Sequence, residues 1–475
     1  MSDQRWLRVM VLAGTAAAAM ALASVLTAAS ALAEDTALIM GGSGNPIPSQ
    51  SNLDSVNELY VHCDPPVCTP QPLFTPEGLY PFFGVKELPF DTSLSQGVTI
   101  LNEAIKQQLA DGSHVTVFGS SQSADIASVE MANIADGTAG IHPAGDQLSF
   151  VLSGDEMNPN GGALMRFDLP AGSEPSFPSF GITFLGATPV SEYPTEVYTG
   201  EYDGFADFPR YPLNLLSDVN ALLGIVFVHI ATPTPAELAQ AVAVPTSAGY
   251  DGATGYEMIP TENLPLLDPV RSIPGFGPIL ADLVQPDLKV LVNLGYGDPD
   301  YGWVNENSDV PTPVGVFPSA ADLDKVPALL ATGAQEGIQK ATADIEAAFG
   351  DPSQFFSLVG NPIATLLQNG LVGTAIGGNG GAGEGLTGFV NALSSAASQL
   401  YSTLLPTADT LNALFTSIPA YDASVFASEL AHGNLLDAFG LPLAADAGLL
   451  TFLTGFEIAP VGEGLVNAVM DLLHA

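Results

Sequence analysis

The chain of 475 residues is poor in basic side chains. It contains 10 Lys and Arg against 51 Asp and Glu, which gives a formal net charge of −41 at pH 7. Because such a surface repels phosphate groups, neither nucleic acid nor an anionic lipid head group is an expected partner. We expect the carboxylates to form a solvated surface that keeps the protein dispersed, since 47% of its residues are hydrophobic.

Cysteine is scarce as well. The only two, Cys63 and Cys68, stand close together in the segment HCDPPVC. In an exported chain such a pair is most simply a disulfide that closes a small turn. A metal site that also includes His62 is the alternative, although no second pair of ligands with zinc spacing follows. We expect no metal and no cofactor.

Charge is absent from a long N-terminal segment. Arg5 and Arg8 precede the uncharged run Val9–Ala33, and acidic residues follow it. This is the pattern of an export signal, and the last three residues of the run, Ala-Leu-Ala, fit the small-x-small rule for cleavage. The run is also long enough to cross a bilayer as an uncut anchor. We therefore expect an exported protein of the cell envelope, either secreted or attached to the membrane through residues 1–33.

The rest of the chain divides into two parts at about residue 302. In residues 34–302, apolar strand patterns alternate with helical patterns, which predicts an α/β fold with a mainly parallel sheet covered on both faces. The predicted strands are 36–40, 114–119, 147–154, 195–204 and 255–261, and the predicted helices are 93–113, 123–135 and 212–229. Residues 303–475 are rich in Ala and Leu and helical in pattern, with a glycine run at 377–385 that predicts a flexible joint. We expect the apolar faces of these helices to pack on the first part or on one another rather than on a membrane.

The segment HVTVFGSSQSADIAS, residues 114–128, places small residues around a serine where a strand gives way to a helix. Gly119 and Ser123 lie two residues before and two after Ser121. In a strand, turn and helix, this spacing lets the backbone fold sharply and lifts the hydroxyl above the sheet edge. Ser121 is therefore the candidate nucleophile of an α/β-hydrolase, with serine where the usual pattern ends in glycine. An ordinary strand-to-helix turn is the alternative.

Histidine is also scarce, and this selects the candidate base. In an α/β-hydrolase an acid and then a histidine follow the serine, each expected at the end of a later strand. Of the six histidines only His229 fits, and the other five lie before Ser121, before any plausible acid loop, or in the C-terminal helices: His62, His114, His142, His432 and His474. A lone histidine after an apolar run is ordinarily structural, but the shortage of alternatives favours a catalytic role.

The candidate acid lies in the segment EVYTGEYDGFADFP. Asp203 stands at the end of the predicted strand 195–204 and is followed by glycine, as in the acid loop of many lipases. Asp207 is the alternate acid, and Asp155 in LSGDEMNPNGG is a weaker third candidate. An exposed or turn-capping aspartate is the alternative role for each of them.

Acyl chemistry also needs hydrogen-bond donors for the oxyanion. One is expected to be the backbone N–H of Gln122, directly after the nucleophile, and the other to come from Gly42 or Ser43 in the glycine loop after the first strand. That loop, GGSGNP, matches neither a dinucleotide-binding fingerprint nor a phosphate-binding loop.

Several of these segments together resemble the PE-PPE domain of mycobacteria and their relatives. They are GVTILNEAI, VFGSSQSADIAS, LSFVLSGDEMNPNGG, FLGATPVSEYPTEVYTGEYDGFADFPRYPLNLLSDVNALLG and MIPTENLPLLDPVR, within about residues 80–300. The resemblance implies a serine hydrolase of the α/β-hydrolase fold that acts on acyl esters, as an esterase in some members and as an acyltransferase to envelope glycolipids in others. By position it implies Ser121 as nucleophile, Asp203 or Asp207 as acid, and His229 as base.

One departure from the family pattern concerns the N-terminus. No PE or PPE segment precedes the domain, and the export or anchor segment stands in its place. This arrangement is similar to the membrane-attached acyltransferases that finish acylated trehalose lipids. We expect an exported esterase or acyltransferase whose partner is an acyl ester or a glycolipid. A non-catalytic envelope protein that keeps the fold for binding or structure is the alternative.

Overall fold

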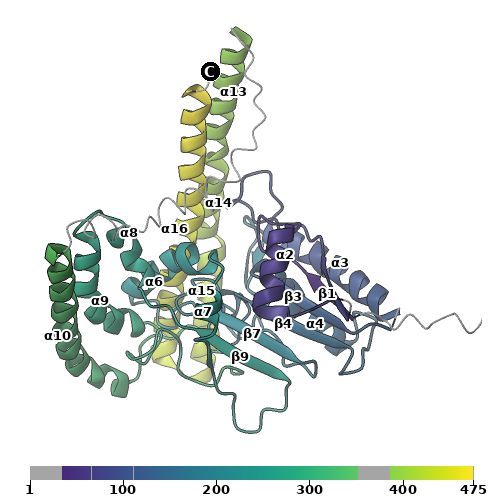
Figure 1. Cartoon of the computed structure of the whole chain (residues 1–475), viewed down its shortest axis with the longest axis horizontal. Helices are drawn as coiled ribbons and strands as arrows, with labels where there is room; N and C mark the ends of the chain where they lie inside the picture. The colour runs from purple at the N-terminus through teal and green to yellow at the C-terminus, as the bar shows by residue number, and fades with distance from the viewer. Residues whose placement is uncertain (1–34, 66, 111, 351–385, 474–475) are drawn as a thin grey trace, which may run out of the picture.

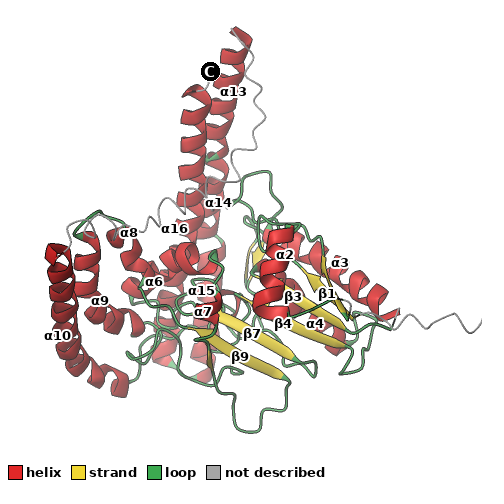
Figure 2. Cartoon of the chain, in the orientation of Figure 1, coloured by secondary structure: helices red, strands yellow, loops and turns green. Residues whose placement is uncertain are grey.

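The computed structural model describes residues 35–65, 67–110, 112–350 and 386–473. The predicted export segment and the glycine run at 377–385 lie outside the described residues. The centre of the molecule is a seven-stranded sheet with the order β2-β1-β3-β4-β7-β9-β8 (Figure 2). Neighbouring strands are parallel except β8, which pairs antiparallel with β9. The strands are β1 (Asp35–Ile39), β2 (Cys68–Pro72), β3 (Val115–Ser120), β4 (Leu148–Ser153), β7 (Thr195–Gly200), β8 (Val242–Ala243) and β9 (Thr254–Ile259). The predicted α/β class with a mainly parallel sheet is confirmed.

Helices cover both faces of the sheet because its strands are apolar on both sides. Along β1 and β3, Leu38 and Val117 belong to one buried cluster, whereas the next residues, Ile39 and Phe118, belong to another. This alternation follows from side chains pointing to opposite faces along a strand. Helices α3 (Phe90–Ala110) and α4 (Gln122–Asp136) cover the first face. Helix α2 (Gln50–Val56) and the turn η1 (Asn57–Val61) cover the second.

The order of the strands creates a switch point at the carboxyl edge of the sheet. β2 pairs with one side of β1, and the chain then crosses to place β3 on the other side. In open parallel sheets, ligands bind where the strand order reverses in this way. The glycine loop after β1 and the turn after β3 therefore meet at the position where a site is expected.

β2 was not among the predicted strands, because its sequence CTPQP contains two prolines. Proline cannot donate to a neighbouring strand, and β2 is tolerated because it lies at the edge of the sheet. Cys68, its first residue, forms a disulfide with Cys63.

The remaining elements up to residue 350 connect and flank the sheet. They are α5 (Ala163–Arg166), the hairpin of β5 (Ser176–Phe177) and β6 (Ile182–Thr183), α6 (Leu215–Gly224) and the π-helical turn η2 (Ile225–His229), α7 (Pro235–Leu238), η3 (Pro265–Leu267), α8 (Asp268–Arg271), α9 (Gly277–Asn293) and α10 (Ala320–Gly350). Helices α9 and α10 pack together at the side of the molecule away from β1 (Figure 1).

In the described residues 386–473 the structure has four helices: α13 (Leu386–Ser402), α14 (Leu404–Phe415), α15 (Ser417–His432) and α16 (Leu435–Leu473). α13 and α16 run side by side and project from the body (Figure 1), while α16 also packs on α15 and α6. Leu449 and Leu453 of α16 are buried in the same hydrophobic cluster as the sheet. The core therefore continues from the sheet into the C-terminal helices. By length and composition α16 is also apolar enough to cross a membrane, a property that buried helices share.

Candidate active site

Ser121 sits on a strained turn between β3 and α4. Its backbone has φ 56° and ψ −132°, a combination that residues with a side chain rarely adopt. A Cβ on Gly119 would lie 2.4 Å from the carbonyl oxygen of Ser123, so the turn closes this tightly only with glycine at residue 119. The result is the sharp strand-to-helix elbow that presents a side chain above the carboxyl edge of the sheet.

Ser123 occupies the position where the usual pattern has glycine. Its side chain is fully buried, and its Oγ accepts a hydrogen bond of 2.7 Å from the backbone N–H of Ser120. The same hydroxyl donates to the carbonyl oxygen of Ser120 at 3.1 Å. Serine is therefore accommodated because it is small and because its hydroxyl satisfies backbone groups at the end of β3.

The structure brings Ser121, His229 and Asp203 into one hydrogen-bonded chain. The Oγ of Ser121 lies 2.9 Å from Nε2 of His229. Nδ1 of His229 lies 2.8 and 2.9 Å from the two carboxylate oxygens of Asp203. This is the relative arrangement of nucleophile, base and orienting acid in serine hydrolases.

Asp203 and His229 reach this position in different ways. Asp203 follows the end of β7, as expected, and its Oδ1 accepts hydrogen bonds from the backbone N–H groups of Phe205 and Ala206. His229 is the last residue of η2, which continues α6, so it stands at the end of the helix predicted over residues 212–229. The general expectation that the base follows a strand was wrong, because here a helix extends to the carboxyl edge of the sheet.

Two glycines allow α6 and η2 to lie directly on the acid loop. A Cβ on Gly204 would come within 2.1 Å of the carbonyl oxygen of Ala221, and a Cβ on Gly224 within 1.9 Å of that of Tyr202. The two segments therefore approach each other through their backbones. The contact therefore joins the residue after Asp203 to the helical segment that carries His229.

The two other candidate acids lie elsewhere. Asp207 is fully buried, and its Oδ2 accepts a hydrogen bond from the backbone N–H of Tyr202 at 3.0 Å. Burial raises the pKa of Asp207 well above its ordinary value, although nearby Arg166 opposes the shift. Asp155 accepts hydrogen bonds from Thr188 and from the backbone of Met157. Both carboxyls hold loops together beside the site.

The candidate oxyanion donors lie next to Ser121. Gln122 is the first residue of α4, where backbone N–H groups have no partner within the helix. Gly42 passes so close that a Cβ on it would lie 3.7 Å from Oγ of Ser121. The side-chain amide of Gln122 donates to Oγ of Ser43 at 3.3 Å and to the carbonyl oxygen of Gly78 at 2.9 Å. The first bond connects the start of α4 to the glycine loop after β1, and the second connects it to the segment before α3.

Glu156 is a site residue that the sequence analysis missed. Its Oε1 accepts a hydrogen bond of 3.2 Å from Oγ of Ser121, so it shares that hydroxyl with His229. Its side chain is buried, and burial raises its pKa from 4.5 to about 7, although the charge of His229 opposes the shift. Its place directly after Asp155, which was considered, is the only sequence signal that pointed to it.

Further buried carboxyls surround Glu156. Burial raises the pKa of Asp125 well above its ordinary value, and the charges of Glu156 and Asp155 add to the shift. Burial likewise raises the pKa of Asp155 to about 6 and that of Glu77 to about 8. A carboxyl buried this deeply is stable mainly in its neutral form. The buried carboxyls behind Ser121 therefore keep their protons to higher pH than exposed carboxyls do.

The pKa of His229 reflects opposing influences. Burial alone would lower it, but the charge and hydrogen bond of Asp203 and the charge of Glu156 raise it above its ordinary value of 6.5. The imidazolium form is thereby stabilised, as a base that accepts a proton during the reaction requires.

A wide cavity opens beside His229 and Asp203 at the carboxyl edge of the sheet. It encloses about 2340 Å³ of space that includes open solvent. Many of its lining side chains are polar, among them Asn45, Asn52, Thr232, Thr234, Glu237, Gln240, Thr261, Glu262, Asn263, Asp268 and Lys289. We call it the polar cleft. In the part of the chain that the structure describes, no group of three or more His, Cys, Asp or Glu is placed to hold a metal ion.

A mainly parallel sheet with a serine elbow at its carboxyl edge defines an α/β-hydrolase fold. The chain belongs to the PE-PPE domain family, whose model matches residues 66–297. The resemblance seen in the sequence is therefore confirmed.

Three relatives from Mycobacterium tuberculosis strain H37Rv illustrate the family. The uncharacterized PPE family protein PPE28 is 43% identical over 471 residues, which cover 95% of this chain and 70% of the relative. Esterase PE16 is 43% identical over 62% of this chain and 53% of its own length. SL1278 acyltransferase Chp1 is 28% identical over 60% of this chain and 70% of its own length. No solved structure is significantly similar.

Proposed function

We propose that the protein is a serine hydrolase of lipid acyl esters that forms an acyl-enzyme on Ser121. The observation that carries this proposal is the continuous chain from Oγ of Ser121 through His229 to Asp203, at distances of 2.8 to 2.9 Å. Relatives named esterase and acyltransferase support an ester as the substrate. Asp203, rather than Asp207, is the acid, because only Asp203 contacts the imidazole in the described residues.

The first half-reaction follows from this geometry. As Oγ of Ser121 attacks the ester carbonyl, its proton passes to Nε2 of His229, and Asp203 stabilises the imidazolium that forms. The bond to the alcohol then breaks, and His229 returns the proton to the leaving oxygen. The backbone N–H of Gln122 and a donor from Gly42 or Ser43 stabilise the oxyanion. Losing one such donor typically raises the barrier by about 3 to 4 kcal/mol.

The second half-reaction releases the acyl group. His229 takes a proton from water in an esterase, or from a hydroxyl of a glycolipid in an acyltransferase, as that oxygen attacks the acyl-enzyme. Ser121 leaves with a proton returned by His229. Which of the two oxygens attacks the acyl-enzyme depends on how well the site excludes water.

We further propose that the protein acts in the cell envelope after export directed by residues 1–33. This location matches a lipid substrate.

Covalent labelling tests this proposal. A fluorophosphonate probe is expected to label the folded protein, and labelling is expected to fall to background in Ser121→Ala. Ser95→Ala, a change at an exposed serine on α3, serves as the control and should label normally. If the folded wild type is not labelled, the non-catalytic alternative is favoured. Labelling that persists in Ser121→Ala would place the nucleophile elsewhere.

A further inference from the structure

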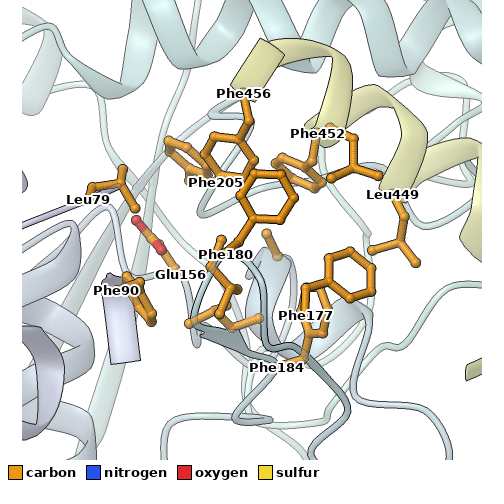
Figure 3. A pocket seen from close by; sticks show the side chains of 14 residues that line it. Leu79, Phe90, Glu156, Phe177, Phe180, Phe184, Phe205, Leu449, Phe452 and Phe456 are labelled. Atoms are coloured by element: carbon orange, nitrogen blue, oxygen red, sulfur yellow. The ribbon is translucent and has the colours of Figure 1, made fainter. Parts of the chain in front are cut away.

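A second cavity lies between the catalytic body and α16, and its lining is almost wholly apolar (Figure 3). It encloses about 600 Å³ of space that includes open solvent. We call it the aromatic chamber. Among the described residues that line it, Glu156 provides the only polar side chain, and the others are Leu79, Phe90, Ala163, Leu164, Phe177, Phe180, Ile182, Phe184, Phe205, Leu449, Phe452, Leu453 and Phe456.

α16 forms one wall of the aromatic chamber. Its four lining residues, Leu449, Phe452, Leu453 and Phe456, recur every three or four residues and so share one face of the helix. Figure 3 shows Phe452 and Phe456 pointing from α16 into the cavity. The ring of Phe456 stacks on Phe180 with 5.9 Å between centroids. The hairpin of β5 and β6 and its flanking residues form the opposite wall.

The aromatic chamber begins at the candidate catalytic residues. Glu156, at its edge beside Leu79 and Phe90 in Figure 3, is hydrogen-bonded to Oγ of Ser121 at 3.2 Å. Phe205, which also lines the chamber, places its ring 4.9 Å from that of His229 and stacks on Phe452 at 6.0 Å. A group bonded to Ser121 would therefore lie beside this cavity.

The two cavities suit different parts of an ester substrate because their linings differ in polarity. A sugar in the aromatic chamber would bury hydroxyls without partners, which is unfavourable, whereas a hydrocarbon chain gains free energy by leaving water. The polar cleft offers amides, hydroxyls and carboxylates instead and shares no lining residue with the chamber. The occupant that fits the chamber is thus an aliphatic chain.

We propose that the aromatic chamber binds the acyl chain of the substrate and that α16 determines the chain length accepted. This inference rests on the proposed function, because it requires an acyl group attached to Ser121. α16 lies after the family-matched residues 66–297, and the proposal makes it part of the substrate site.

The test compares p-nitrophenyl acetate with p-nitrophenyl octanoate on the full chain. The wild type is expected to have the higher kcat/KM for octanoate. In Leu453→Trp, an indole ring replaces the smaller leucine side chain and fills the chamber from α16. The octanoate-to-acetate ratio of kcat/KM is then expected to fall at least tenfold. Leu450→Trp, at a residue 43% exposed on the same helix, is the matched control and should keep the wild-type ratio. Ile182→Trp narrows the chamber from the opposite wall if Leu453→Trp does not fold.

The outcomes distinguish the two proposals. Equal kcat/KM for the two esters in the wild type, or an unchanged ratio in a folded Leu453→Trp or Ile182→Trp protein, would overturn the acyl-chain site while ester cleavage stands. A folded wild type that neither cleaves acetate nor reacts with the fluorophosphonate would instead overturn the hydrolase. A fall in the ratio in the chamber variants, with Leu450→Trp unchanged, supports the site.

Discussion

At the scale of single residues, Glu156 extends the hydrogen-bonded group formed by Ser121, His229 and Asp203. It contacts the hydroxyl that His229 also contacts, and its charge adds to that of Asp203 in raising the pKa of His229. Glu156 therefore affects the pKa of His229, although Asp203 is the residue that contacts and orients the imidazole. It also lies where the polar triad meets the apolar chamber.

Replacing Glu156 with Gln should change the pH dependence of the reaction. Glutamine keeps the size of the side chain but removes the negative charge, so the pKa of His229 falls. Because the proposed base, His229, can accept a proton only when it is neutral, the acid limb of the kcat/KM profile should move to lower pH. The measurement is p-nitrophenyl acetate hydrolysis between pH 5 and 9. Glu103→Gln, at an exposed residue of α3, is the control, and an acid limb that stays in place would contradict the role given to Glu156.

The candidate triad could be found from the sequence at this scale because few residues competed for each role. Ser121 stood between small residues, and His229 was the one histidine left after the others were excluded by position. The choice between Asp203 and Asp207 stayed open, because both lie in one loop and only the folded backbone turns one of them toward the imidazole. Glu156 was missed because its contact with Ser121 joins two separate strand ends.

At the scale of elements, the position of the base depends on α6 and η2 lying against the acid loop. Local periodicity predicted the helix at 212–229. It could not predict the π-helical turn or the backbone contact through Gly204 and Gly224, because that contact joins segments that are distant along the chain. The edge strand β2 was missed for a related reason: its prolines are tolerated only at the sheet edge.

Replacing Gly224 with Ala tests this contact. Alanine favours helix over glycine, yet its Cβ would lie 1.9 Å from the carbonyl oxygen of Tyr202, so the helix must shift and carry His229 with it. A displacement of about 1 Å at a catalytic group can lower the rate about 100-fold. We expect the rate of fluorophosphonate labelling to fall by about this factor. Gly145→Ala, where a new Cβ meets nothing within 4 Å, is the control. Labelling of Gly224→Ala at the wild-type rate would show that the contact does not set the geometry.

At the scale of the whole molecule, stability is expected to decrease as the pH rises. Burial raises the pKa of Glu77 and Asp218 to about 8 and that of Glu130 to about 7. In the unfolded chain these groups lose their protons near their ordinary values of 4.5 and 3.8. Between those values and the raised ones the folded state binds more protons, so the free energy of unfolding falls with increasing pH. The net charge of −41 adds repulsion in the same direction.

Thermal unfolding at pH 5.5 and pH 8.5 measures this dependence. The Tm is expected to be higher at pH 5.5, and the difference should be smaller in Glu77→Gln, which cannot ionise. Added salt screens the surface repulsion but not the buried carboxyls, so it should remove only part of the difference. A Tm that rises from pH 5.5 to pH 8.5 would show that these carboxyls are ionised in the folded protein.

The wall that α16 gives to the aromatic chamber has a consequence for fragments of the chain. A fragment limited to the family-matched residues 66–297 would retain Ser121, Asp203 and His229. It would lack the glycine loop after β1 and all four side chains that α16 places opposite the β5–β6 hairpin. Such a fragment would carry Ser121 beside an open trough, and during synthesis the site would reach its final shape only after α16 has left the ribosome.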